Sequence, residues 1–216
     1  MIIQFQQKST RFLFLLLIAD LLFIAVHALY KMNVFSNPLF SIEKDFGYAE
    51  VYQYIKEYWI AALLIIAAFN KRLLILVAWA LLFGYFLLDD SLRIHETFGD
   101  YIARSLQIQP MFNLRAQDFG ELIVSAAAGT VLFSFLGLAY LYSHSSAREV
   151  SRQLFLLVIC MVFFGILVDM LQIAIPWGRT VWGMVEDGGE MVIMSVIVWY
   201  VYHIEMRIEQ ASTVLS

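Results

Sequence analysis

The chain has 216 residues, of which 62% are hydrophobic and 15% charged, and its formal net charge at pH 7 is −4. Its mean hydropathy of +0.76 is too high for a soluble domain, because a fold of this length cannot bury so much apolar surface. The composition therefore excludes a soluble globular protein and predicts a polytopic membrane protein. The acidic balance gives no indication of nucleic-acid binding.

Apolar runs along the chain predict the membrane spans, because a helix needs about 20 mostly apolar residues to cross a bilayer. The sequence predicts an all-α integral membrane protein with six transmembrane helices in one bundle. They take up most of the chain, which leaves a single membrane domain over residues 1–216. The predicted spans are 12–30, 54–70, 72–89, 119–143, 153–175 and 184–204.

Two connections carry recognisable patterns. The aromatic-rich stretch 41–59 predicts an interfacial segment with solvated charges, so its acids are assigned no chemistry. These acids are Glu43, Asp45, Glu50 and Glu57. The loop between the third and fourth spans is expected to be helical.

Basic residues at span ends indicate the orientation. The NKR segment at 70–72 and the AREVSR segment at 147–152 lie directly at helix ends, where the positive-inside rule is strongest. With these segments inside, both termini are cytoplasmic, and we expect the protein in the plasma (inner) membrane. Of the 18 acidic residues, 14 then lie on the outer side or just within it.

Acidic side chains recur near the outer ends of four predicted spans. They close the third span, follow the start of the fourth, precede Pro176 in the fifth and begin the sixth. Ionisable residues in a span are costly unless they face the bundle interior and find partners. We therefore predict one outward-facing cavity that collects most of these groups within about 10 Å, the reach of side chains on packed helices. The candidate metal-ligating residues are Asp89, Asp90, His95, Glu96, Glu121, Asp169, Glu186, Asp187 and Glu190.

Helical spacing supports this set. Glu186 and Glu190 are four residues apart, so they share a helix face. Asp20 and His27 are seven apart on the first span, which lets His27 approach the same centre while Asp20 lies deeper. Gly188 and Gly189 are poor helix residues, and we expect them to permit close helix contact or a local break beside the acids.

Clustered carboxylates with one or two imidazoles and no thiolate indicate a cation site, because like charges need neutralisation. Oxygen-rich sets suit Mg²⁺, Ca²⁺ or Mn²⁺, and an added histidine admits Fe²⁺ or Zn²⁺. The segments DDSLRIHE (89–96) and EDGGE (186–190) are the richest sources of ligands.

Three functions remain open on the sequence. The first is a membrane-embedded, metal-dependent enzyme that acts on a lipid or another amphipathic substrate. The second is a proton- or cation-coupled transporter or channel. The third is a structural or accessory subunit in which Arg93, Arg104, Arg115 and Arg179 pair with the acids. The first is favoured because the polar residues gather on one side of the membrane, as in an outward-opening site and not as in a path through the bundle. The chain contains no H-E-x-x-H, G-x-S-x-G or Walker motif.

Overall fold

The structure is a computed structural model that describes residues 2–175 and 177–215. The described residues are almost entirely helical and form no strand; the only extended pairing is a single bridge between Met111 and Leu114. The elements in chain order are α1 (Ile2–Lys31), η1 (Pro38–Phe40), α2 (Tyr48–Lys71), α3 (Leu74–Leu92), α4 (Ile94–Ser105), α5 (Ala116–Leu141), α6 (Ser145–Val162), the π-helical segment η2 (Phe163–Val168), α7 (Asp169–Ala174) and α8 (Arg179–Leu215).

Four helical stretches are long and apolar enough to cross a membrane. They are Ser9–Lys31, Leu74–Leu92, Ala116–Leu141 and the continuous stretch Ser145–Ala174 through α6, η2 and α7. Helices are favoured there because every backbone polar group must be satisfied within the segment when water is absent. These stretches correspond to four of the predicted spans.

The other two predicted spans, 54–70 and 184–204, are helical and lie within α2 and α8. Each contains charged residues that lower its mean hydropathy. They are Lys56 and Glu57 in the first, and Glu186, Asp187 and Glu190 in the second. The six-span bundle is therefore not confirmed as a whole, although the helical content of every predicted span is.

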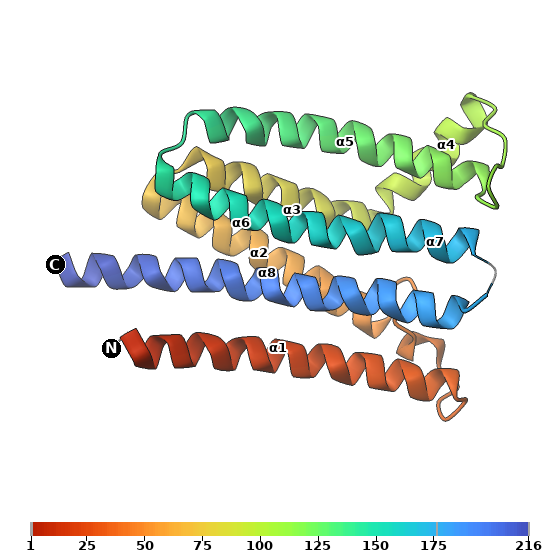
Figure 1. Ribbon diagram of the computed structural model, residues 1–216, viewed down its shortest axis with the longest axis horizontal. Helices are drawn as coiled ribbons and strands as arrows, with labels where there is room; N and C mark the ends of the chain where they lie inside the picture. Colours follow the sequence, from red (N-terminus) through yellow and green to blue (C-terminus); the bar gives the residue numbers. More distant parts are fainter. Residues whose placement is uncertain (1, 176, 216) are drawn as a thin grey trace.

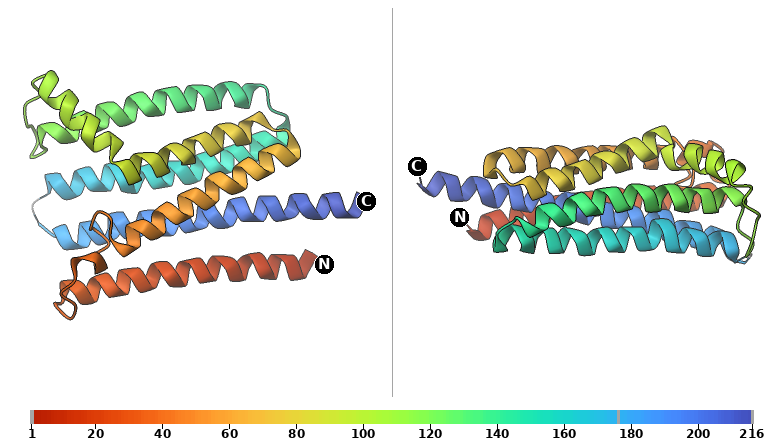
Figure 2. Two further views of the ribbon diagram at one scale, coloured as in Figure 1. Left: turned by 180° about the vertical axis from the view of Figure 1, so that it is seen from behind. Right: turned by 90° about the horizontal axis from the view of Figure 1, so that it is seen from above.

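The long helices lie side by side along one axis (Figure 1). Both ends of the chain lie at one end of the molecule, together with the α2–α3 and α5–α6 turns. The opposite end, called the site end below, holds α4, the α1–α2 connection, the end of α7 and the start of α8. Figure 2 shows the same arrangement from behind and from above, with α1 along one edge and α5 along the other.

The core that joins the helices lies between α2, α3, α6 and α8. Trp79 and Phe83 on α3 are fully buried there, against apolar residues of α2, α6 and α8. The Trp79 indole N–H donates to Ser151 Oγ at 3.0 Å. This apolar packing occupies the half of the bundle away from the site end, so the polar side chains collect at the other half.

The first half of α2 corrects one prediction. Residues 48–59 are helical, and one face of that helix is buried in the bundle: Gln53, Lys56, Glu57, Ile60 and Leu64. Lys56 and Glu57 are 0% and 1% exposed. The prediction that this stretch carries only solvated charges at an interface is therefore wrong for these two residues, because the helix turns them toward α1, α3 and α8 rather than toward water.

A left-handed residue separates α3 from α4. Arg93 has φ 53° and ψ 48°, and its N–H returns to the carbonyl of Asp89, which ends α3. A non-glycine residue in this region costs about 1–2 kcal/mol. The break turns α4 away from the axis of α3, as Figure 1 shows, and it confirms the expected helix between the third and fourth spans.

Candidate metal centre

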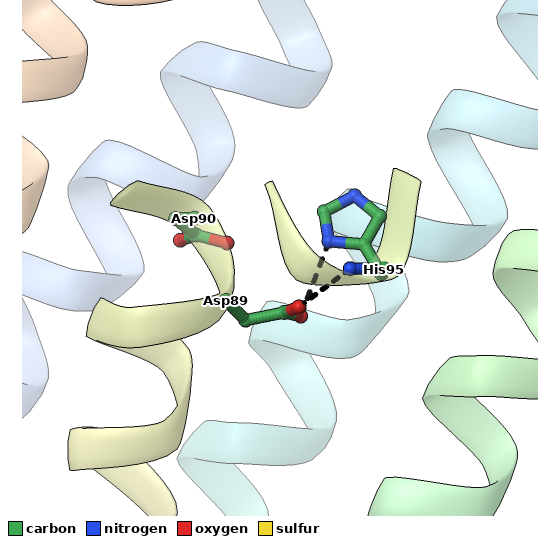
Figure 3. Close-up of side chains that lie close together, drawn as sticks. All are labelled: Asp89, Asp90 and His95. Carbon is green, nitrogen blue, oxygen red and sulfur yellow. Dashed lines mark hydrogen bonds and ion pairs between the residues drawn. The ribbon is translucent and has the colours of Figure 1, made fainter. Parts of the chain in front are cut away.

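The break at Arg93 brings the end of α3 and the start of α4 together around the carboxylate of Asp89. Asp89 Oδ1 accepts the backbone N–H of His95 at 2.8 Å, and Asp89 Oδ2 lies 3.1 Å from His95 Nδ1. Figure 3 shows both contacts, with the carboxylate of Asp90, the next residue of α3, close by. Asp89 is 8% exposed and the His95 side chain 30% exposed, so the carboxylate is shielded from water and the imidazole only in part.

Asp89, Asp90 and His95 have the spacing of ligands to one ion. Each offers one ligand atom, and the three atoms lie within 4.8 Å of one another. Oxygen and nitrogen ligands lie about 2.0–2.6 Å from Zn²⁺, Mg²⁺ or Ca²⁺, so two ligands of one ion lie at most about 4–5 Å apart. Three of the nine predicted ligands therefore form a group with metal-like geometry.

The charge on His95 depends on its neighbours. The contact with Asp89 raises the pKa of His95 above its ordinary value of 6.5, and the charges of Asp90 and Glu121 act in the same direction, while burial opposes them. An imidazole ligand must be deprotonated before it binds a metal. A proton and an ion therefore compete for the same ring.

Glu57 adjoins this group, although the sequence interpretation assigned it no role. Its carboxyl group and that of Asp90 approach within hydrogen-bonding range. Two carboxylates that close repel each other unless they share a proton or a cation. The signal that could have revealed Glu57 is its place on the face of α2 that continues into Ile60 and Leu64.

Two predicted ligands lie across the site end on α5 and α7. Glu121 accepts a hydrogen bond from Gln117 Nε2 at 2.8 Å and lies within Coulombic range of His95. Asp169 lies within Coulombic range of Glu121 and His95 as well. Both lie near His95, but neither belongs to the group of three, so their role as ligands stays a prediction.

The three predicted ligands on α8 lie close to one another and to Asp169. Glu190 is within Coulombic range of Asp90, Asp187 and Asp169, and Glu186 is within range of the last two. A Cβ atom on Gly165 would lie 1.9 Å from Glu190 Oε1, so the carboxylate of Glu190 rests against the backbone of η2. π-Helical turns often occur at functional sites, and this one makes room for an acidic side chain.

The paired glycines of α8 permit close helix contact, one of the two expected roles. A Cβ on Gly189 would lie 2.4 Å from Phe164 Cδ1, and one on Gly188 would lie 3.2 Å from Ile24 Cδ1. The helix continues through both residues without a break.

Glu96 lies on the outer side of α4 and is engaged elsewhere. Arg93 Nε donates to Glu96 Oε1 at 2.9 Å, and the same guanidinium lies 3.4 Å from Asp45 Oδ2. The pair is partly exposed. The structure therefore places Glu96 in a surface ion pair rather than with Asp89, Asp90 and His95.

The arginines proposed to lock the helices pair mainly within their own helices. Arg104 pairs with Asp100 at 2.7 Å, and Arg115 pairs with Asp118 at 2.6 Å, where Asp118 also caps α5. The fourth arginine, Arg179, has a side chain outside the described residues. Among the described arginines only the Arg93–Asp45 pair bridges distant segments, so the arrangement does not form a ring of arginine–carboxylate locks.

Two buried side chains of opposite charge, one on α1 and one on α2, form an ion pair. Lys56 Nζ lies 3.1 Å from Asp20 Oδ1, and both side chains are 0% exposed. His27, also 0% exposed, accepts the backbone N–H of Ile42 and contacts Ser41 Oγ, each at 3.2 Å, through Nδ1. His27 is therefore held by the α1–α2 connection and is not part of the metal-like group.

The comparisons with known proteins give a family and no further relative. No curated protein and no solved structure matches the chain. The family described as "Domain of unknown function (DUF8692)" matches residues 10–206, which include every residue of the candidate site. The chain belongs to this family.

Proposed function

We propose that the protein is a six-span membrane protein that binds a divalent cation at Asp89, Asp90 and His95. The observation that carries the proposal is the approach of three ligand atoms to within 4.8 Å of one another. Nothing else in the described residues gathers three such atoms so closely. The carboxyl groups of Glu57 and Glu190 lie close enough to Asp90 to interact with it electrostatically.

The ligand set narrows the kind of ion. Two carboxylates and one imidazole suit Mn²⁺, Fe²⁺ or Zn²⁺ better than Ca²⁺ or Mg²⁺, which prefer oxygen alone. Three protein ligands leave at least one position for water or a substrate, as in catalytic sites rather than structural ones. An ion held here would therefore supply Lewis-acid chemistry.

The position of the site supports a membrane-embedded enzyme that acts on a lipid or another amphipathic substrate. Asp89 and Asp90 lie in the last turn of an apolar helix that ends at Leu92, and α4 begins directly afterwards. That position corresponds to the depth of lipid headgroups when α3 spans the bilayer. A substrate with a polar head and an apolar tail would present its head to this centre.

The other two functions have weaker support. A structural subunit would need interhelical arginine locks, and the described arginines mostly pair within one helix. A cation transporter would need a polar path through the bundle, and the path from the site meets the positive charge of Lys56. We therefore propose a cation held at a fixed site rather than a path for cations through the bundle.

Equilibrium binding of Mn²⁺ and Zn²⁺ to chelator-treated protein in detergent tests this function. The wild type should bind with saturation, and Asp90→Asn and His95→Gln should each weaken binding by about tenfold or more, because each removes a ligand. Asp100→Asn is the matched control, since it makes the same chemical change on α4 but alters only the pair with Arg104. Absent saturation in the wild type, or equal weakening in the control, would overturn the proposal.

A further inference from the structure

Lys56 is the buried charge that the proposed metal centre does not use. Besides its ion pair with Asp20, its ammonium donates to the carbonyl of Met191 at 2.8 Å and to Ser195 Oγ at 3.3 Å. It also lies 4.6 Å from the centre of the Tyr52 ring. Three helices, α1, α2 and α8, thus fix one positive charge inside the bundle.

This charge lies beside the acidic cluster, defined here as Glu57, Asp90 and Glu190. Lys56 is within Coulombic range of Glu57 and Glu190, and both of these residues are within range of Asp90. Glu57 joins the two sites, since it follows Lys56 in the chain and its carboxyl group meets that of Asp90. Its Oε2 atom has no hydrogen-bond partner among the described residues.

Most other described bases near the site end are paired, and Lys44 is exposed at the surface. Lys31 Nζ lies 2.6 Å from Glu43 Oε2, and Arg93, Arg104 and Arg115 hold acids at the surface or at a helix start. Lys56 is therefore the described base that compensates the cluster from within the bundle. Asp20 in turn balances the charge of Lys56 through their ion pair.

A purely structural ion pair would explain the contact between Asp20 and Lys56 but not its position beside Glu57 and Glu190. Buried pairs contribute little net stability because desolvation offsets their attraction. Their electrostatic effect on neighbouring charges is large, however, because screening by water is absent.

We propose that the Asp20–Lys56 pair sets the affinity of the Asp89, Asp90 and His95 centre for divalent cations. This inference rests on the proposed function. Lys56 holds its positive charge beside Glu57 and Glu190 and repels an incoming divalent ion, while Asp20 reduces that repulsion. The two partners of one ion pair therefore act on the ion with opposite signs.

The opposite signs give the test, measured as Mn²⁺ or Zn²⁺ affinity in detergent. Lys56→Met removes the positive charge and should tighten binding about tenfold, whereas Asp20→Asn leaves the positive charge less compensated and should weaken binding about tenfold. The double variant Asp20→Asn/Lys56→Met removes both charges and should bind nearly as the wild type does. A merely structural pair would lower affinity in both single variants through the same disturbance of packing.

Binding by the wild type and the affinity of the double variant serve as controls for the single variants. Saturable binding by the wild type establishes the site itself, so its absence would overturn the proposed function before the variants are considered. If Lys56→Met does not fold because Asp20 is left unpaired, the double variant is compared with Asp20→Asn, and it should bind more tightly. Equal affinities in that comparison, or single variants that shift affinity in the same direction, would overturn the inference.

Discussion

Asp89 positions His95 through two contacts, one to the backbone and one to the ring. The backbone contact fixes the start of α4, and the ring contact holds Nδ1 at 3.1 Å from the carboxylate. Carboxylates that orient a histidine in this way tune its basicity as well as its direction. In the metal-free protein the same contact favours the protonated imidazole.

The pH dependence of stability follows from the raised pKa of His95. A histidine whose pKa is raised in the folded state contributes stability in full below its unfolded pKa of about 6.5, and that contribution is lost as pH rises through the folded pKa. Metal-free protein should therefore lose stability as pH rises above about 6.5, the ordinary value from which this pKa is raised. Thermal unfolding after chelator treatment measures it, and His95→Gln should remove that part of the pH profile. An unchanged profile in the variant would show that another group is responsible.

The sequence was sufficient to predict that Asp89, Asp90 and His95 lie close together, because DDSLRIHE places them at the end of an apolar run. Their role as metal ligands stays a prediction. The sequence was not sufficient for Lys56 and Glu57. Aromatic neighbours in VYQYIKEYW resemble a membrane interface, and only the helical face that continues to Leu64 shows that these charges point inward. The pairing of Glu96 with Arg93 also depends on the left-handed turn, which no local pattern in the sequence predicts.

At the scale of elements, a close glycine contact fixes α4 against α5 and so determines where His95 lies. A Cβ on Gly120 would lie 2.0 Å from the carbonyl oxygen of Gly99. That oxygen belongs to backbone, which cannot move aside as a flexible side chain can. The structure thus needs a residue without a side chain at this crossing.

Gly120→Ala should therefore separate α4 from α5 and destabilise the protein by about 1–3 kcal/mol, the usual cost of overpacking. Metal affinity should fall as well, because His95 moves with α4. Gly137→Ala on the same helix is the control, since no atom lies within 4 Å of its added methyl group, and it should leave stability unchanged or slightly raised. Thermal unfolding and metal titration of both variants provide the comparison; equal behaviour of the two would refute the role of the contact.

The ends of apolar runs predict the spans but not the full helices: α2 begins at Tyr48 rather than 54, and α8 ends at Leu215 rather than 204. The helix between the third and fourth spans was expected. The π-helical segment Phe163–Val168 was not, because FFGILV has the composition of any membrane helix. Its effect appears only in three dimensions, where Gly165 meets Glu190.

At the scale of the whole molecule, both chain ends lie at one end, and α4 and the start of α8 lie at the other (Figure 1). The predicted acidic ligands belong to elements that meet at that second end: the end of α3, α4, the start of α5, α7 and the first turns of α8. We propose that the site end faces outward and that both termini are cytoplasmic. On a background without Cys160, a cysteine at Ser105 should react with an impermeant reagent added outside intact cells, and one at Ser146 should not. Ser105 ends α4, and Ser146 lies in the first turn of α6 at the opposite end. The reverse labelling pattern would invert the orientation and place the site on the cytoplasmic side.

Pulsed electron paramagnetic resonance of Mn²⁺ bound to the purified protein tests the metal centre most directly, because it detects nitrogen coordinated to the ion. The wild type should show coupling to one histidine nitrogen. His95→Gln should abolish that coupling, while His27→Gln, which changes a buried histidine outside the group, should retain it. A spectrum without nitrogen coupling, or one unaffected by the loss of His95, would contradict the assignment of the ion to Asp89, Asp90 and His95.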